Sequence, residues 1–469
     1  MIRMDLDKLF FPRSVCLVGA SRDPMAYGHI ILKNMITGGY KGRVLPVNPN
    51  AKVILDLKCY SSVSEIPEED IDLAVVAVPA RVVPSVMLEC GKRRIPFAIV
   101  ISAGFKETGE AGRALEGKVV KIAKDYGIRI VGPNCMGIYN SDNNFTATFT
   151  SLVPKHGGIS FVSQSGGVGI TMLAWAKGEG IGFSKFVSVG NEADLSIVDF
   201  LNYLEDDDST KVVTAYVESV RDGRALVRSF SSISPKKPVI IMKVGTTQTG
   251  ARAAVSHTGA MAVEDSVMNG IFKQFSIIRV NDTEELFRLA TSFAALPMPK
   301  GRSAAILSSG GGWAVECSDL LEAKGISLPP LPKDTIAFLD TVLPAFWSRR
   351  NPVDMVAASS SKAYVLTVER LLRQKEFDMV FLIGYGVFSA IAVPAMSSLD
   401  VECALKIASL VKEIGKPLFI VDVLGPNQSE SARAFERAGL PIFSTVRAAV
   451  ETAAEMTRYG EYLGKRLKV

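Results

Sequence analysis

The chain has 469 residues, 48% of them hydrophobic, which excludes an intrinsically disordered protein and leaves room for roughly two to four domains. Its 53 basic and 48 acidic residues give a net charge of +5, which is too small to indicate a nucleic-acid partner. Six cysteines lie far apart without a Cys-x-x-Cys pair, as in reduced cytoplasmic proteins. His29 and His156 have no partners at metal-ligand spacing, so we expect no metal site.

The sequence shows no clear membrane signal. The start of the chain lacks the apolar region of a signal peptide. An uncharged stretch at 379–399 is interrupted by Gly384, Gly386 and Pro394, which favours a buried strand, a loop and a helix over a membrane span. We therefore expect a cytoplasmic protein with no membrane partner.

Apolar strands alternate with helical patterns along the whole chain. In the first segment, strands are expected within 14–21, 43–49, 71–79 and 98–104, and helices at 27–36, 82–92 and 111–126. The strands are continuous β-branched runs, which is typical of parallel strands buried on both faces. This predicts a Rossmann-like domain at 1–145, and the same pattern recurs at 157–296 and 302–469. The fold class is therefore α/β, with three domains.

The first strand runs into Gly19-Ala20-Ser21, a small-residue loop that can cradle phosphate through its backbone N–H groups. The glycine-rich dinucleotide fingerprint is absent, since the next glycine is Gly28. The second strand ends at Asn48 and lacks the acidic residue that binds the ribose of NAD. These residues favour a nucleotide-like ligand other than NAD, the alternative being a Rossmann shell without a ligand.

A second loop, Ser163 to Gly167, follows a strand and opens a helix. Two hydroxyls and two glycines at a helix start favour an anion-binding nest, because a simple helix cap needs only one of them. The alternative is a tight turn whose serine caps the helix.

His257 follows the strand at 238–242 through a polar loop and precedes Thr258-Gly259-Ala260, which favours a turn opening a helix. An imidazole at the carboxyl edge of a sheet can accept a phosphoryl group, although a surface histidine explains the residues equally well. Glu218 ends the strand at 212–217. If that strand neighbours the one before His257, the carboxylate could orient the ring; on the residues alone an ordinary solvated strand end is favoured.

The third segment contains two further loops after strands, Ser308 to Trp313 and Gly384 to Gly386. Each can present a helix start to phosphate, and each can equally be a plain turn between a strand and a helix. Asn351-Pro352-Val353-Asp354 is a polar turn to which the residues alone assign no chemistry.

Taken in order, these motifs resemble the alpha subunit of ADP-forming (NDP-forming) acyl-CoA synthetases, relatives of succinyl-CoA synthetase. The resemblance covers nearly the whole chain and rests on ten motifs in order: Val18-Gly19-Ala20-Ser21, Val47-Asn48-Pro49, Val78-Pro79-Ala80, Ile101-Ser102-Ala103-Gly104-Phe105, Gly132-Pro133-Asn134-Cys135-Met136-Gly137, Ser163-Gln164-Ser165-Gly166-Gly167, Ser188-Val189-Gly190-Asn191, Val217-Glu218-Ser219, Ser256-His257-Thr258-Gly259-Ala260 and Asn351-Pro352-Val353-Asp354.

The resemblance implies a CoA-binding Rossmann-like domain followed by two flavodoxin-like domains of the succinyl-CoA-synthetase type. It implies that His257 is phosphorylated and that Glu218 orients it, in place of the solvated strand end. The positions it implies for phosphate are Ser163, Gln164, Ser165, Gly166, Gly167, Thr258 and Gly259. Those it implies for CoA are Gly19, Ala20, Ser21, Arg22, Val78, Pro79, Ala80, Ser102, Ala103, Gly104 and Asn134.

The family also implies an ATP-grasp domain that binds ADP or ATP with Mg, and no such region precedes Val469. We therefore expect a separate ATP-grasp beta subunit and, by resemblance, a heterotetramer. The implied reaction converts acyl-CoA, phosphate and ADP reversibly to acid, CoA and ATP, with acetyl-CoA as the leading acyl-CoA. The rival interpretations are a CoA-binding regulatory subunit without turnover and, disfavoured by the missing fingerprint, an NAD-dependent oxidoreductase.

Overall fold

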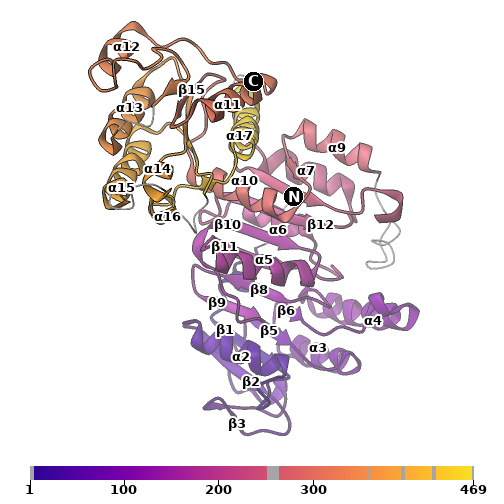
Figure 1. Cartoon of the computed structure of the whole chain (residues 1–469). Helices are drawn as coiled ribbons and strands as arrows, with labels where there is room; N and C mark the ends of the chain where they lie inside the picture. The colour runs from indigo at the N-terminus through magenta and orange to yellow at the C-terminus, as the bar shows by residue number, and fades with distance from the viewer. Residues whose placement is uncertain (1–4, 251–263, 356–359, 392–396, 425–428, 467–469) are drawn as a thin grey trace. The chain divides into compact units, whose positions relative to one another are not determined.

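The computed structural model describes residues 5–250, 264–355, 360–391, 397–424 and 429–466. The chain divides into two units, 1–290 and 291–469, and the division falls within α10 (Thr283–Ala295). The first unit contains two large sheets built mainly of parallel strands, and the second unit contains one parallel sheet (Figure 1). Among the described residues, no helix has both the length and the apolar character needed to cross a bilayer.

The first sheet has five parallel strands in the order β2-β1-β5-β6-β7. Its strands are β1 (Ser14–Val18), β2 (Arg43–Val47), β5 (Leu73–Val76), β6 (Phe97–Val100) and β7 (Arg129–Val131), and its helices are α2 (Tyr27–Thr37), α3 (Val83–Lys92) and α4 (Glu110–Tyr126). Every residue of β1, β5 and β6 is buried, so the expectation of strands covered on both faces is confirmed for these three. The edge strand β2 differs, since it begins at the exposed Arg43.

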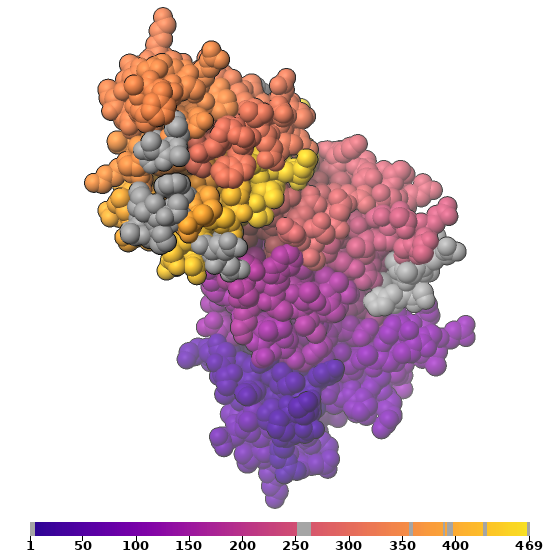
Figure 2. Space-filling model, in the orientation of Figure 1, coloured from indigo at the N-terminus to yellow at the C-terminus, as the bar shows by residue number. Residues whose placement is uncertain are grey.

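The two faces of this sheet enter two different cores. Cys16 and Val18 join a core under α3 and α4, whereas Val15 and Leu17 join a larger core that continues to Ile277. The first and second sheets therefore share one hydrophobic core, and Figure 2 shows the first unit as a continuous body. A two-stranded ribbon, β3 (Val53–Ile54) with β4 (Leu57–Lys58), lies outside the sheet.

The second sheet has the order β14-β13-β12-β10-β11-β8-β9. Its parallel strands are β10 (Lys155–Ser163), β11 (Gly182–Ser188), β12 (Val212–Val217), β13 (Val239–Lys243) and β14 (Ile278–Val280), and the helices that connect them are α5 (Gly166–Gly178), α6 (Ile197–Leu204), α7 (Gly223–Ile233) and α9 (Asp265–Gln274).

An antiparallel hairpin, β8 (Gly137–Asn140) and β9 (Phe145–Thr148), closes one edge of the second sheet. It follows the last strand of the first sheet directly in the chain, so most of it falls within the segment 1–145 expected to form the first domain. The ammonium group of Lys185, which is fully buried on β11, lies 3.0 Å from Asp142 in the hairpin turn and 2.7 Å from Asp207. The hairpin is thus bound to the second sheet by backbone and side chains alike.

The second unit contains a parallel sheet in the order β16-β15-β17-β18-β19. Its strands are β15 (Ala304–Ser308), β16 (Val353–Asp354), β17 (Met379–Ile383), β18 (Leu418–Val421) and β19 (Ile442–Phe443), and its helices are α11 (Gly311–Ala323), α12 (Lys333–Leu339), α13 (Ser361–Arg373), α14 (Val387–Ile391), α15 (Ser397–Ile414), α16 (Glu430–Arg437) and α17 (Val446–Arg466).

The parallel part of each sheet follows the same order. Numbered along the chain within each sheet, the five parallel strands lie as 2-1-3-4-5. The second strand lies on one side of the first and the third lies on the other, so the chain changes direction there. Ligands of open α/β sheets bind at this switch point, beyond the carboxyl ends of strands 1 and 3. In all three sheets, predicted motif loops follow these two strands.

Candidate active site

A cavity of about 460 Å³ lies at the switch point of the first sheet. The loops after β1 and β5 line it and include Gly19, Ala20, Ser21, Val78 and Pro79, five of the positions expected to contact CoA. The tip of β2, segment 61–63 and part of α3 complete the lining. A cavity of this size, lined by backbone and small side chains, suits part of a nucleotide-like ligand.

Two glycines allow the close packing beside this cavity. Gly19 has a φ of +94°, and a Cβ atom there would overlap the carbonyl of Ala77. A Cβ atom at Gly28, the second residue of α2, would overlap the carbonyl oxygen of Gly19. Gly28 therefore gives the close helix–loop packing that the third glycine of a dinucleotide fingerprint provides, at a longer spacing than that motif has.

The Asn48 side chain at the tip of β2 is used within the protein. Asn48 Nδ2 donates to Ala20 O at 2.7 Å, and Asn48 Oδ1 accepts from Asn50 N at 2.8 Å. Asn48 thus fastens the loop after β1, where an NAD-binding protein would present a carboxylate to the ribose. Arg22 is exposed, and its guanidinium donates to Asn50 O at 3.4 Å.

The loop after β6 lies against the loop after β5. Ser102 Oγ donates to Val78 O, and a Cβ atom at Gly104 would stand 3.1 Å from Ala80 Cβ. Asn134 N donates to Ser102 O at 2.9 Å. The structure therefore gathers the predicted CoA-contacting loops at one sheet edge, although Arg22, Ala80, Ser102–Gly104 and Asn134 do not line the 460 Å³ cavity.

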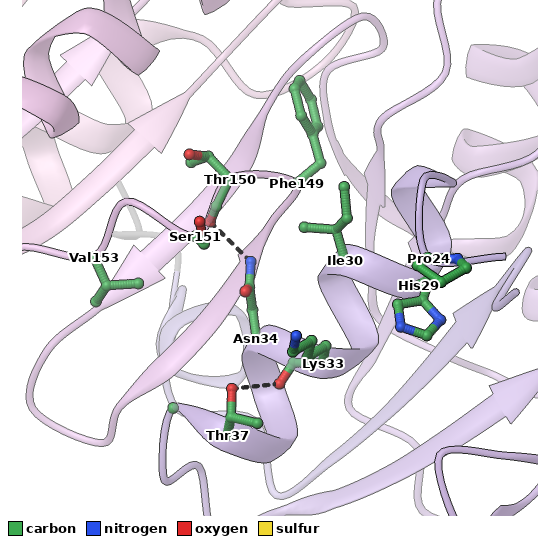
Figure 3. A pocket seen from close by; sticks show the side chains of 11 residues that line it. Pro24, His29, Ile30, Lys33, Asn34, Thr37, Phe149, Thr150, Ser151 and Val153 are labelled. Carbon is green, nitrogen blue, oxygen red and sulfur yellow. Dashed lines mark hydrogen bonds between the residues drawn. The ribbon is translucent and has the colours of Figure 1, made fainter. Parts of the chain in front are cut away.

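A second cavity of about 480 Å³ lies between α2 and the segment after β9 and contains none of the predicted site residues (Figure 3). His29 and Lys33, one helical turn apart, are its basic side chains, and Asn34 Nδ2 donates to Thr150 O at 2.8 Å. His29 also contacts Ser21 O through Nδ1 at 2.9 Å, so α2 helps to hold the loop after β1.

The loop after β10 opens α5 as the sequence predicts. Ser165 is the N-cap, and its Oγ accepts from Val168 N at 3.3 Å; Ser163 Oγ donates to Ser165 O at 2.7 Å. The prediction that a serine of this loop caps the helix is therefore confirmed for Ser165. A Cβ atom at Gly167 would meet nothing within 4 Å, which leaves room beside the first turn of α5. A helix start of this kind, with N–H groups not used by the cap, can also hold an anion.

Gln164 makes bonds within the protein that its position in the motif did not predict. Its side chain is buried and bonds to Glu218 N, Ser219 N, Ser219 O and Glu192 Oε2. All hydrogen-bonding groups of the amide are used in these contacts, so a phosphate near Gln164 would meet its backbone and not its side chain.

Glu218 lies at the end of the strand next to the one that leads to His257. It follows β12, which pairs with β13 in parallel register, with Val217 opposite Lys243. The condition that this strand neighbours the one leading to His257 is therefore confirmed. Lys243 Nζ donates to Glu218 O at 2.9 Å, and burial lowers the pKa of Lys243. His257, Thr258 and Gly259 lie outside the described residues.

Two polar residues to which the sequence assigns no role, Asn191 at the end of the Ser188–Asn191 motif and Glu192 just beyond it, lie in the loop after β11. Glu192 is 4% exposed and has a φ of +51°. Burial raises the pKa of its carboxyl to about 7, opposed by hydrogen bonds from Ile197 N and Gln164 and by nearby Arg221 and Lys106. A strongly shifted carboxyl in a polar cluster marks a candidate functional residue. The available sequence signal was Gly190, which places this polar pair directly after a strand.

In the second unit, the two glycine loops meet at the third switch point. A Cβ atom at Gly384, whose φ is +74°, would overlap Ser309 and approach the Trp313 ring. Asn351 bonds to Ile306 N, Ala304 O and Pro329 O, so its motif fastens the edge of β15. Among the described residues, no group of three or more histidine, cysteine or acidic side chains could hold a metal ion.

Comparison with known proteins defines the class. The model of a CoA binding domain matches residues 13–141, and that of a succinyl-CoA ligase like flavodoxin domain matches residues 156–293. A solved structure described as the dinucleotide forming acetyl-coenzyme A synthetase 1 of Ca. Korarchaeum cryptofilum, in complex with phosphate and ADP, is 34% identical, with a TM-score of 0.91 and 99% of each chain covered. These matches confirm the α/β fold and place the chain among CoA-dependent ligases of the succinyl-CoA-ligase type.

Two relatives of known activity narrow this class of ligases further. The chain is 36% identical to acetate–CoA ligase [ADP-forming] II subunit alpha of Pyrococcus furiosus, over 98% of this chain and 99% of that protein. It is 37% identical to acetate–CoA ligase [ADP-forming] I of Archaeoglobus fulgidus, over 98% of this chain but only 64% of that protein. The chain belongs to the family of ADP-forming acetate–CoA ligase alpha subunits, as its motifs predict.

Proposed function

We propose that this chain is the alpha subunit of an ADP-forming acyl-CoA synthetase, with acetyl-CoA as the leading substrate. A phosphate oxygen attacks the thioester carbonyl, the C–S bond breaks, and CoA leaves as its thiol with a proton from phosphate. His257 Nε2 then attacks the phosphorus of the acyl phosphate, and the carboxylate leaves. Phosphohistidine finally donates the phosphoryl group to ADP, and each step runs in both directions.

One juxtaposition carries this proposal: β10, β12 and β13 are neighbours in the second sheet. Their carboxyl ends bring the start of α5, Glu218 and the segment leading to His257 to one edge. In this arrangement the α5 start holds phosphate charge, and Glu218 accepts the Nδ1–H of the imidazole. That contact keeps Nε2 as the nucleophile and stabilises the phosphorylated ring. The chemistry is mainly positioning and electrostatic stabilisation.

On the CoA side, the loops after β1 and β5, which line the 460 Å³ cavity, hold the nucleotide part of CoA there, and the loop after β6 lies against them. The family-model match to a CoA binding domain at 13–141 supports this role. Asn48 in place of an acidic residue at the tip of β2 argues against NAD. The individual contacts, including those of Arg22 and Asn134, belong to this proposal.

The nucleotide step requires a partner. We assign ADP or ATP with Mg to an ATP-grasp beta subunit, in a cytoplasmic heterotetramer. The designation of the Pyrococcus relative as subunit alpha supports a second subunit. The Korarchaeum structure, a complex with phosphate and ADP, supports these two molecules as ligands of the assembled enzyme.

The deciding experiment incubates the full chain with acetyl-CoA and radiolabelled phosphate, alone and with its partner subunit. Wild type should take up acid-labile, alkali-stable label, and His257→Ala should take up none. Glu218→Gln should slow labelling by about 10- to 100-fold, since it weakens the group that orients the ring. Glu264→Gln, which changes an exposed carboxylate just after the histidine segment, is the matched control and should label normally.

A regulatory CoA-binding subunit is the competing function. It predicts that CoA binds while no acyl-CoA supports labelling of His257, even with the partner present. That combination of results would replace the proposed enzyme by the regulatory subunit.

A further inference from the structure

A continuous polar network runs behind Glu218. Glu218 N and Ser219 N both donate to Gln164 Oε1, at 2.6 and 3.0 Å, and Gln164 Nε2 donates to Ser219 O at 2.9 Å. Gln164 Nε2 also donates to Glu192 Oε2 at 3.1 Å. Both donors and both acceptor sites of the amide are occupied, so the amide has a single favourable orientation. Three of these bonds hold the backbone of Glu218 and Ser219, and the fourth joins the amide to Glu192.

Glu192 holds the other end of that amide. Its Oε1 accepts from Ile197 N, the first residue of α6, at 2.7 Å, while Oε2 accepts from Gln164. Both oxygens act as acceptors, which is the pattern of an ionised carboxylate. Because the side chain is almost completely buried, losing either bond would leave a buried polar group without its partner.

The residue before Glu192 reaches the CoA side. Asn191 Nδ2 donates to Glu107 Oε2 at 2.6 Å and to Glu116 Oε2 at 2.9 Å. Glu107 Oε1 in turn accepts from Gly104 N at 2.6 Å and from Phe105 N at 3.0 Å. Two adjacent residues of one loop are thus bonded to the two predicted site regions: Glu192 to the phosphate region through Gln164, and Asn191 to the CoA region through Glu107.

We propose that Gln164 and Glu192 are positioning residues for Glu218, and that Asn191 couples this pair to the Ser102–Gly104 loop on the CoA side. The inference rests on the proposed function, because the position of Glu218 matters for rate only if it orients a phosphorylated histidine. A catalytic group must be held within about 0.5 Å of its working position, and a bonded supporting shell of this kind holds it there.

The protonation state of Glu192 controls the network. The charged groups that face it or its neighbour Asn191 come from other elements: Lys106, Glu107 and Glu116 after β6, and Arg221 after β12. A proton on the carboxyl would replace one acceptor oxygen by a donor opposite either Gln164 Nε2 or Ile197 N. Since burial raises the pKa of Glu192 to about 7, the network is weakened below neutral pH and complete above it.

Glu192→Gln mimics the protonated state and tests the proposal. The rate of His257 labelling by acetyl-CoA and phosphate should fall about tenfold or more, while the KM values for both substrates change less than about twofold. The dependence of that rate on pH between about 6 and 8 should also flatten. Asn191→Asp, which removes the donor to Glu107 and Glu116, should instead raise the KM for acetyl-CoA.

Glu205→Gln is the matched control. Glu205 is 3% exposed in the same unit and bonds to Ser232 Oγ at 2.8 Å, away from the network. Hydrogen exchange adds a readout independent of turnover: amides of peptide 212–221 should exchange faster in Glu192→Gln and at the wild-type rate in Glu205→Gln.

The outcomes separate the two proposals. Labelled wild type with an unchanged rate, pH profile and exchange in Glu192→Gln overturns the positioning role alone. Unlabelled wild type, with partner and other acyl-CoAs present, overturns the proposed function and with it the kinetic role of the pair. Equal slowing in Glu192→Gln and Glu205→Gln reduces the effect to general destabilisation and also overturns the positioning role.

Discussion

Single residues set the geometry of both predicted site regions. Gly28 touches Gly19 so closely that no side chain fits between helix and loop. Gln164 and Glu192 use buried polar atoms to hold the backbone beside Glu218. In each case a position whose side chain faces no expected substrate determines where a predicted site residue lies, so conservative substitutions there should have measurable effects.

Gly28→Ala should displace the loop after β1, because its Cβ atom would overlap Gly19 O. We expect a loss of stability of about 1–3 kcal/mol and at least about tenfold weaker CoA binding. The same change at Gly117, inside α4 with nothing within 4 Å of its Cβ, is the control. It should stabilise the protein by about 0.5–1 kcal/mol. Chemical denaturation and calorimetric CoA titration measure both effects, and equal behaviour of the two variants would refute the packing argument.

The raised pKa of Glu192 predicts how the stability of the protein changes with pH. The cost of burying the charged carboxylate outweighs the hydrogen bonds that favour it, so the folded-state pKa, about 7, lies above the ordinary value of 4.5. The protonated side chain therefore contributes stability that is complete below about pH 4.5 and is lost as pH rises through 7, even though the ionised form makes more hydrogen bonds. The unfolding free energy of wild type minus that of Glu192→Gln should therefore fall by roughly 2–3 kcal/mol between pH 5 and 8. Urea titrations across this range measure it, and a constant difference would contradict the shift.

At the scale of elements, the start of α5 combines a helix cap with a predicted phosphate site. Ser165 caps the helix, and it is also among the residues predicted to surround phosphate. Ser360 caps α13 with the same geometry, its Oγ accepting from Ala363 N at 3.3 Å, in the other unit. The two caps therefore form a natural matched pair.

Ser165→Ala and Ser360→Ala should each cost about 1 kcal/mol of stability, as the loss of an N-cap does. Only Ser165→Ala should also slow the labelling of His257, because only its helix start faces the proposed phosphate. Parallel melting curves and labelling rates test this. Normal labelling by Ser165→Ala would leave Ser165 as a cap alone.

The strands and their parallel pairing could be read from the sequence because each is a continuous apolar run between glycine-containing loops. Gly19, Ser163 and Glu218 could be singled out since they directly follow such runs. The role of Glu192 could not, because its burial arises only when the loops after β6, β10, β11 and β12 meet. The ion pairs of Lys185 could not be predicted either, because its partners Asp142 and Asp207 lie in other segments of the chain.

At the scale of the molecule, three sheets of one strand order place six motif loops at three switch points. The first of these carries the ligand prediction that is simplest to test. CoA should raise the melting temperature of the full chain, since binding at 100 times Kd adds about 2.7 kcal/mol, whereas NAD should leave it unchanged. Differential scanning fluorimetry measures both, and stabilisation by NAD would reverse the interpretation of Asn48.

The hairpin of β8 and β9 has a consequence for how this chain can be divided. A gene fragment ending near residue 141, where the match to the CoA binding domain stops, would cut between its two strands. The remaining half-hairpin would expose unpaired backbone, and the rest of the chain would lose the strand that covers β11, which would promote aggregation of both pieces. Exchange of the first domain, whether by evolution or in the laboratory, should therefore succeed where the whole hairpin stays in one piece with the second sheet.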